Sequence, residues 1–366
     1  MWYTLANVDE VNSPALLVYP SRVDENVRRM IALAGGTLRL RTHVKTHKMA
    51  EVIRRQLAVG ITKFKCATIA EAEMVADCGA PDVLLAYPPV GPNAQRMARL
   101  AASFLGTRFS TIADDAGAIR RLAAACVAAG VQMEVLLDLD VGMHRSGVAP
   151  GPAAIELYRL IADSPGLALG GLHVYDGHIR TRDPEVRRRE TAAAFAPVDA
   201  LRAELAAAGL PVPRIVAGGT PTFPMHARRD DVECSPGTCV LWDHSYQTKF
   251  PDLDFVNAAL VLTRVVSKPA QDRLCLDLGY KAVSPDNADP RVVFPELSEA
   301  KMIVHSEEHL AIETPRANEY AVGDVLYGVP FHICPTVALY EEAVVVENGR
   351  AVDHWRVVAR DRKLTI

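Results

Sequence analysis

Short β-rich runs alternate with longer stretches of helical spacing from about residue 14 to residue 240, and this alternation constrains the fold more than any other feature. Strands that alternate with helices are typical of an α/β fold with a parallel sheet. An open doubly wound sheet is the alternative, but it usually has fewer strands or a Gly-x-Gly-x-x-Gly turn, which this chain lacks. We therefore predict a TIM-like (β/α)8 barrel. Its eight candidate strands are residues 15–19, 37–43, 64–68, 83–87, 108–113, 134–141, 168–175 and 214–218.

The pattern changes after about residue 250, where helical spacing largely disappears. Short β-rich runs separated by turn residues predict a second, mostly β domain. The expected barrel covers residues 14–248, and the expected β domain covers residues 249–366 together with residues 1–13. The candidate strands of the β domain are residues 258–266, 273–278, 325–328, 343–346 and 354–358.

Composition excludes several classes of protein. Hydrophobic residues make up 49% and charged residues 23%, an ordinary balance for a globular protein. A formal charge of -4 with no strongly basic half argues against nucleic acid as a partner. No apolar run is long enough for a membrane span, and the first residues do not form a secretory signal. Seven scattered cysteines, an odd number, favour a reducing compartment, so we expect a cytoplasmic protein.

Two lysines and two histidines follow the second candidate strand, in the stretch R-T-H-V-K-T-H-K of residues 41–48. A lysine at a buried strand end can lose its proton, because desolvation and nearby cations lower its pKa. Only the free amine attacks a carbonyl, so Lys45 is a candidate Schiff-base lysine. A solvated basic edge or a phosphate-binding patch is the alternative reading of the same cluster.

Two further motifs follow later barrel strands, where the functional residues of such barrels gather. In D-V-G-M-H-R-S-G, residues 140–147, the glycines let the backbone approach a ligand, and Arg145 can hold a ring oxygen or a carboxylate. In Y-D-G-H, Tyr175 offers a face to a planar cofactor and His178 a proton-transfer group. A surface arginine and a structural histidine in ordinary turns are the alternatives.

Two glycine turns that end in a hydroxyl residue come next along the chain. They are A-G-G-T, residues 217–220, and E-C-S-P-G-T, residues 233–238. Backbone N–H groups and hydroxyls in such turns bind phosphate, and two turns after neighbouring strands are typical of a barrel phosphate site.

The chain also contains His332-Ile-Cys334. We expect this segment to be a strand, in which residues i and i+2 face the same side. The imidazole and thiol would then project together and could bind a divalent ion, with thiolate favouring Zn²⁺. A buried cysteine beside an unrelated histidine is the alternative.

These motifs, taken in order, resemble those of the D-threonine aldolase and D-serine dehydratase family, which are pyridoxal-phosphate enzymes of the alanine racemase-like fold. The resemblance extends from Ser13 to Trp355. It implies a barrel plus a β domain, usually in a homodimer, and pyridoxal 5'-phosphate as the cofactor. It also implies a divalent metal (Zn, Mn, Mg or Co) held by His332 and Cys334.

The same resemblance implies roles for the residues around the cofactor. Lys45 would be joined to it, with His43 alongside. Arg145 would lie near its phenolic oxygen and Tyr175 near its ring. The residues implied around its phosphate are Gly218, Gly219, Thr220, Gly237 and Thr238.

The reaction that the resemblance favours is retro-aldol cleavage of a β-hydroxy D-amino acid, such as D-threonine, to glycine and an aldehyde. The candidate base is His178 or a hydroxide on the metal. The alternative is a D-serine or D-threonine dehydratase that gives a 2-oxo acid and ammonia. A His/Cys metal pair occurs in the dehydratases and in some aldolase-like members, whereas other aldolases have an aspartate at the second position. A cofactor carrier and a racemase, with Tyr280 or Tyr327 as its second acid, remain further alternatives.

Overall fold

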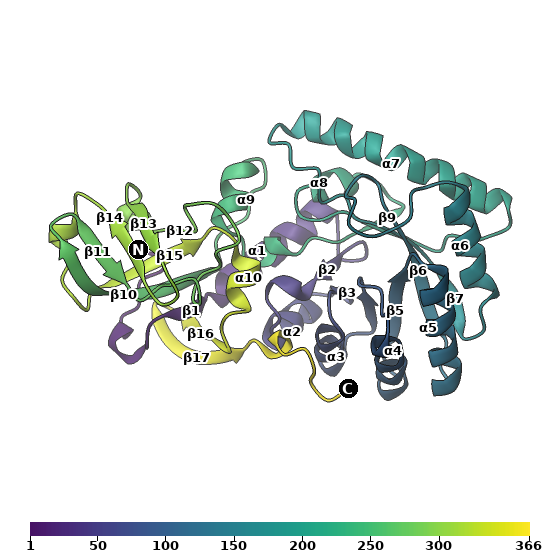
Figure 1. Cartoon of the computed structure of the whole chain (residues 1–366), viewed down its shortest axis with the longest axis horizontal. Coiled ribbons are helices and arrows are strands. Elements are labelled where there is room, and N and C mark those ends of the chain that lie inside the picture. Colours follow the sequence, from purple (N-terminus) through teal and green to yellow (C-terminus); the bar gives the residue numbers. More distant parts are fainter. The chain divides into compact units, whose positions relative to one another are not determined.

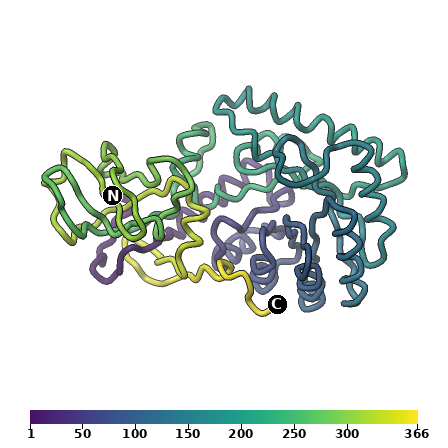
Figure 2. The backbone as a smooth tube through the Cα atoms, viewed as in Figure 1, coloured from purple at the N-terminus to yellow at the C-terminus, as the bar shows by residue number.

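The computed structural model describes all residues, Met1–Ile366, and divides into two compact units (Figures 1 and 2). The β unit comprises Met1–Arg29, Thr46–Val52 and Thr238–Arg360. The barrel unit comprises Met30–Lys45, Ile53–Gly237 and Asp361–Ile366. Each unit is therefore assembled from three segments of the chain.

Eight parallel strands form the barrel unit, as predicted, with each strand paired to the next along the chain. Closure comes from a parallel bridge between Leu40 and Cys234, where Cys234 N donates to Arg39 O at 2.7 Å. Figure 1 shows helices α3–α7 ranged around these strands. The strands are β2 (Arg41–His43), β3 (Lys63–Cys66), β4 (Asp82–Leu85), β5 (Arg108–Ala113), β6 (Met133–Leu139), β7 (Leu167–Val174), β8 (Ile215–Ala217) and β9 (Val232–Cys234).

Local signals explain where several helices begin and end. Thr68 caps α3 by accepting a hydrogen bond from Glu71 N at 3.1 Å, and Glu71 Oε2 accepts one from Ala67 N at 2.6 Å. Gly130, at φ +67°, ends α5 in the left-handed region. The helices are α1 (Pro20–Ala34), α2 (Ala50–Ala58), α3 (Ile69–Asp77), α4 (Pro92–Ser103), α5 (Ala116–Ala129), α6 (Pro152–Asp163), α7 (Pro184–Ala207), α8 (Phe223–His226), α9 (His244–Lys249) and α10 (Ile333–Val337).

Ion pairs occupy the amino-terminal ends of the barrel strands. The fully buried Arg41 guanidinium binds Asp82 Oδ1 at 2.6 Å and Glu233 Oε2 at 2.7 Å. Further along the strands lies an apolar cluster of Leu84, Ile112, Leu136 and Val216. The carboxyl ends of the strands are thereby left for polar residues, and in such barrels this is the end that carries function.

The number of barrel strands was predicted correctly, but one member was wrong. Residues 15–19, expected as the first barrel strand, instead contain β1 (Ala15–Val18) of the β unit. Its partners are β10 in the antiparallel and β16 in the parallel direction. The eighth barrel strand is β9, which the sequence reading treated as part of a glycine turn.

A nine-stranded sheet system dominates the β unit, in agreement with the predicted mostly β character. Its order is β13-β14-β11-β10-β1-β16-β17, and β15 pairs with both β10 and β12. The strands besides β1 are β10 (Ala259–Ala270), β11 (Arg273–Leu276), β12 (Val292–Val293), β13 (Lys301–His305), β14 (Leu310–Glu313), β15 (Val325–Pro330), β16 (Glu342–Glu347) and β17 (Arg350–Arg356).

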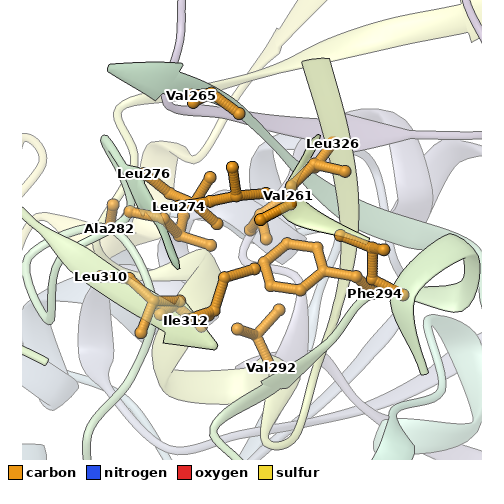
Figure 3. Packing of buried hydrophobic residues seen from close by; sticks show 14 residues of the cluster. Val261, Val265, Leu274, Leu276, Ala282, Val292, Phe294, Leu310, Ile312 and Leu326 are labelled. Atoms are coloured by element: carbon orange, nitrogen blue, oxygen red, sulfur yellow. The ribbon is translucent and has the colours of Figure 1, made fainter. Parts of the chain in front are cut away.

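Two apolar cores stabilise the β unit. One gathers inward-facing side chains of β10, β11, β14 and β15 around Phe294 and Val292 (Figure 3). The other packs Tyr3 and Leu5 against residues of β1, β10, β15 and β16. No helix in the structure is both long and apolar enough to cross a membrane.

Candidate active site

Lys45 lies directly beyond the carboxyl end of β2, where the sequence predicted it. It is the middle residue of the 3₁₀ turn η2 (Val44–Thr46), and its backbone N–H donates to His43 Nδ1 at 3.3 Å. His43 N donates to Pro236 O at 2.8 Å, which ties this strand end to the segment that follows β9. The side chain of Lys45 is half-buried. The turn therefore presents an amine at the carboxyl-end face of the barrel.

Tyr175, immediately after β7, is the point at which the cationic side chains meet. Lys45 Nζ lies 5.9 Å from the centroid of its ring, and Arg145 Cζ lies 4.7 Å from the same centroid. Lys65 Nζ, which the sequence analysis did not select, lies 5.7 Å away. The structure thus brings together three residues expected to contact one cofactor and adds a third cation, so the site favours an anionic planar ligand.

The A-G-G-T turn after β8 packs against the same tyrosine. A Cβ built on Gly219 would lie 3.1 Å from the Tyr175 ring, so this glycine permits a close approach. Gly218 has φ +75° and a Cβ there would lie 2.6 Å from His226. Gly237 N donates to Thr220 Oγ1 at 3.3 Å, which joins the two predicted glycine turns.

One buried hydroxyl near these turns has no partner within the protein. Ser235 is 3% exposed, its backbone N–H donates to Ala217 O at 3.2 Å, and its Oγ makes no hydrogen bond. A buried hydroxyl without a partner is costly unless a ligand completes it. The phosphate of pyridoxal phosphate fits this requirement, because its oxygens accept hydrogen bonds from hydroxyls and from backbone N–H groups.

The buried carboxylate of Asp176 holds the A-G-G-T turn through hydrogen bonds. Asp176 Oδ2 lies 2.7 Å from His226 Nε2, and Asp176 Oδ1 accepts from Thr222 Oγ1 at 2.7 Å. Thr222 Oγ1 in turn accepts from Gly219 N at 3.4 Å. The acid of the Y-D-G-H motif thus supports the turn, a role that the motif alone does not indicate.

His178, the candidate base, lies beside the loop of residues 140–147. Its Nε2 would be 3.0 Å from a Cβ on Gly142, which has φ +116°. Asp140 organises this loop by accepting from Gly142 N at 2.9 Å and from His144 N at 3.0 Å. Burial raises the pKa of Asp140, but these hydrogen bonds outweigh it and lower the pKa overall. The side chain of His178 is exposed.

The His332/Cys334 pair lies in the β unit, and the predicted strand is wrong at this point. β15 ends at Pro330, His332 caps α10, and Cys334 is in the first turn of that helix. The two side chains still approach each other closely enough to hydrogen-bond. Cys334 Sγ also lies 3.2 Å from Thr46 Oγ1 and 3.6 Å from Thr238 Oγ1. Thr238, which the sequence predicted near the cofactor phosphate, lies beside Cys334 in the β unit.

Two carboxylates hold the segment that carries this pair. Asp286 Oδ2 lies 2.5 Å from His332 Nδ1, and Asp243 Oδ2 accepts from Ile333 N at 3.2 Å. Burial lowers the pKa of His332, but Cys334 and Asp286 outweigh it and raise the pKa to about 9. Burial raises the pKa of Asp243 to about 6.

The donor set of this pair suits a divalent metal with open positions. An imidazole and a thiol are ligands that Zn²⁺ and related ions accept, and a carboxylate behind the imidazole is the usual second partner of a metal-binding histidine. No group of three or more His, Cys, Asp or Glu side chains that could hold a metal occurs in the structure. His332 and Cys334 would therefore supply two ligands and leave the other positions to water or substrate.

The fold and these groups define a class of protein: an eight-stranded barrel with an amine, an aromatic ring and glycine turns at its carboxyl-end face, together with a β unit that carries a His/Cys pair. The family model of the alanine racemase N-terminal domain matches residues 18–243, and that of a putative serine dehydratase domain matches residues 258–346. The chain belongs to the D-threonine aldolase and D-serine dehydratase family of the alanine racemase-like fold.

Individual relatives agree with this assignment. A D-threonine aldolase of Arthrobacter is 32% identical over 358 residues, covering 96% of this chain and 93% of its own. The crystal structure of D-threonine aldolase from Filomicrobium marinum superposes with a TM-score of 0.90 at 29% identity, covering 96% of both chains. The D-threo-3-hydroxyaspartate dehydratase of Delftia, solved also as a cysteine-to-alanine variant in a metal-free form, has a TM-score of 0.83; that variant is 25% identical and covers 94% of this chain and 97% of its own.

Proposed function

We propose that the protein is an aldolase, dependent on pyridoxal phosphate and a divalent metal, that cleaves β-hydroxy D-amino acids resembling D-threonine to glycine and an aldehyde. The single observation that carries the proposal is the arrangement of Lys45, Arg145 and the A-G-G-T turn around Tyr175. The similarity to D-threonine aldolases along nearly the whole chain supports the choice of reaction.

The residues of the cofactor site in the barrel unit each have a task in this proposal. Lys45 Nζ would hold the cofactor, and the Ser235 hydroxyl would donate to its phosphate where the two glycine turns meet. Arg145 would bind the phenolic oxygen of the cofactor, and the Tyr175 ring would lie beside its pyridine ring. When bound, pyridoxal phosphate supplies an electron sink for the electron pair released at Cα.

The remaining tasks concern the substrate hydroxyl. His332 Nε2 and Cys334 Sγ would hold a divalent metal, which would supply Lewis-acid chemistry. His178 takes the hydroxyl proton, since its imidazole is exposed and lies beside the loop that carries Arg145. In the alternative dehydratase, Lys45 Nζ instead takes the proton at Cα, and the products are a 2-oxo acid and ammonia.

Product identity is the decisive experiment. Purified enzyme is incubated with D-threonine and with D-serine, with and without chelator. Glycine and acetaldehyde from D-threonine support the aldolase, whereas 2-oxobutyrate and ammonia would overturn it in favour of the dehydratase. Interconversion of D- and L-alanine would instead indicate a racemase, although the hydroxyl of Tyr327, one of the two candidate acids, already accepts from Leu5 N at 3.0 Å.

Two variants separate the cofactor from the metal. Cys334→Ala should retain the absorbance of the bound cofactor and lose turnover, while the matched variant Cys275→Ala, on β11, should keep both. Full activity of Cys334→Ala would contradict a role for the metal pair and leave room for a metal-independent racemase. Borohydride trapping followed by peptide mapping should place the cofactor on Lys45, and a tag elsewhere would contradict the assignment.

The proposal also includes the assembly and the location of the protein. We propose a homodimer, as in the family, and a cytoplasmic location, which the odd number of cysteines, seven, supports. Sedimentation of the purified protein tests the first of these.

A further inference from the structure

Three buried titratable side chains in the barrel unit have no task in the mechanism above. Lys65 lies on β3, Asp138 on β6 and His173 on β7, and each is 3% exposed or less. Lys65 Nζ lies 3.4 Å from His173 Nε2, and His173 Nδ1 lies 2.7 Å from Asp138 Oδ1. A buried charged group is costly unless it is paired, so this arrangement requires an explanation.

The hydrogen bonds fix the roles of the three groups. A carboxylate only accepts, so His173 Nδ1 carries the hydrogen that is donated to Asp138. His173 Nε2 is then the acceptor for the Lys65 amine. Asp138 is held by a second donor, Ser146 Oγ, at 2.9 Å. The chain of hydrogen bonds therefore runs in one direction, from Lys65 to Asp138.

The charge of this group depends on the protonation of Lys65. Burial lowers the pKa of Lys65 to about 7, and Lys45 and Arg145 act in the same direction, while Asp138 and Asp176 oppose them. Burial, with the Lys65 charge adding to it, lowers the pKa of His173, so the imidazole stays neutral. Burial raises the pKa of Asp138, but His173, the hydrogen bond from Ser146 and the charge of Arg145 together outweigh it and lower the pKa, so the carboxylate stays ionised.

Lys65 is directed at the cofactor site. Its amine lies 5.7 Å from the centroid of the Tyr175 ring, near which Lys45 and Arg145 also lie within the same barrel unit. On the strands adjacent to β3, its register partners are His43 of β2 and Leu84 of β4. The groups around Lys65 are thus the cations Lys45 and Arg145, the carboxylates Asp138 and Asp176, the histidines His43 and His173, and the Tyr175 ring.

We propose that Lys65, hydrogen-bonded to the His173–Asp138 pair, is a positioning residue of the cofactor site whose positive charge strengthens the binding of the anionic cofactor. The inference rests on the proposed use of pyridoxal phosphate. The phosphate and the phenolic oxygen carry negative charge, and a cation in a poorly solvated site attracts them strongly. Loss of the Lys65 proton removes that attraction, so cofactor affinity should depend on pH through this residue.

The test compares the dissociation constant of pyridoxal phosphate for full-length protein at about pH 6 and about pH 8.5, on either side of the Lys65 transition. Lys65→Met should bind about tenfold more weakly than wild type at the lower pH and nearly equally at the higher pH. Lys65→Arg, which stays charged, should lack this difference between the two pH values. The matched control Lys63→Met removes a lysine on the same strand that pairs with Glu233, and it should follow wild type.

A variant at Asp138 distinguishes the proposed role of Lys65 from a purely structural effect. Asp138→Asn removes a charge that raises the pKa of Lys65, so the midpoint of the pH dependence should move to lower pH. A wild-type protein that binds no pyridoxal phosphate would contradict the proposed function itself. Wild-type binding with an unchanged pH dependence in Lys65→Met, or with no shift of midpoint in Asp138→Asn, would overturn only the role of Lys65.

Discussion

His332 Nδ1 lies 2.5 Å from Asp286 Oδ2, and this pairing leaves Nε2 as the ring nitrogen available to a metal. Asp286 is itself fixed by Ser284 Oγ, which donates to its other oxygen at 2.7 Å. Thr336 Oγ1 donates to His332 O at 2.9 Å and accepts from Ser284 N at 3.2 Å. A closed ring of hydrogen bonds thus sets the orientation of the imidazole before any ligand binds.

We expect Asp286→Asn to weaken metal binding by about 10- to 100-fold, because the carboxylate orients the imidazole and makes it a stronger ligand. Competition against a coloured chelator measures this affinity directly. The matched control is Asp289→Asn, since Asp289 is exposed and pairs with Arg291 rather than with His332. Equal affinities for Asp286→Asn and wild type would show that the ring of hydrogen bonds has no influence on the metal.

Gly218→Ala should weaken pyridoxal phosphate binding by at least about tenfold, since its Cβ would displace His226 and with it the A-G-G-T turn. The positive φ of +75° adds a backbone cost of about 1–2 kcal/mol. Gly209→Ala is the control, because Gly209 has nearly the same φ, +73°, with open space around it. If cofactor titrations gave the same result for both variants, the clash with His226 would be irrelevant to binding.

Arg41→Met should lower the free energy of unfolding by about 3–5 kcal/mol, because the carboxylates of Asp82 and Glu233 lose their fully buried cation and keep only the more exposed Arg108 and Lys63. Urea unfolding followed by circular dichroism measures the loss. Arg108 also pairs with Asp82 but is 54% exposed, so Arg108→Met should cost about 1 kcal/mol or less. Similar losses for the two variants would contradict the importance of burial at this end of the barrel.

The lowered pKa of Asp82 predicts how the stability of the protein depends on pH. Burial raises the pKa of Asp82, but Arg41 and Arg108 outweigh it and lower the pKa from 3.8 to about 2. Because the pKa is lower in the folded protein, the unfolded chain takes up the proton first as the pH falls. The contribution of the Asp82 carboxylate to the free energy of unfolding is therefore complete above about pH 4 and is lost as the pH falls toward 2. Asp82→Asn should therefore remove about 2 kcal/mol of this pH dependence, measured by urea unfolding between those values.

The strand alternation predicted the barrel, but it did not identify every strand. β1 is a run of four buried apolar residues, and such a run reads the same in a barrel and in a mixed sheet, since its pairing partners lie far away in the sequence. β9 has three residues and places a charged Glu233 between two apolar ones. That charge is tolerated because Arg41 and Lys63 pair with it, which only the folded structure reveals.

The sequence predicted those residues of the candidate site whose type by itself indicates a chemical role. Lys45, Tyr175, Arg145 and the glycine turns fall together after successive strands, as the barrel requires. Lys65 was missed because a lysine within a short strand is usually solvated, and its burial depends on a histidine more than a hundred residues away. The strand expected at His332 was wrong because the chain turns into α10 at that residue.

The pairing of β1 has a consequence for how the protein is made. Leu17 is the register partner of Val344, so the ribosome must synthesise more than 300 further residues before these two strands can meet. Every barrel strand, by contrast, lies between Arg41 and Cys234 and is complete long before then. Because segments made first fold first, the nascent barrel is able to form before either partner strand of β1, β10 or β16, has been made.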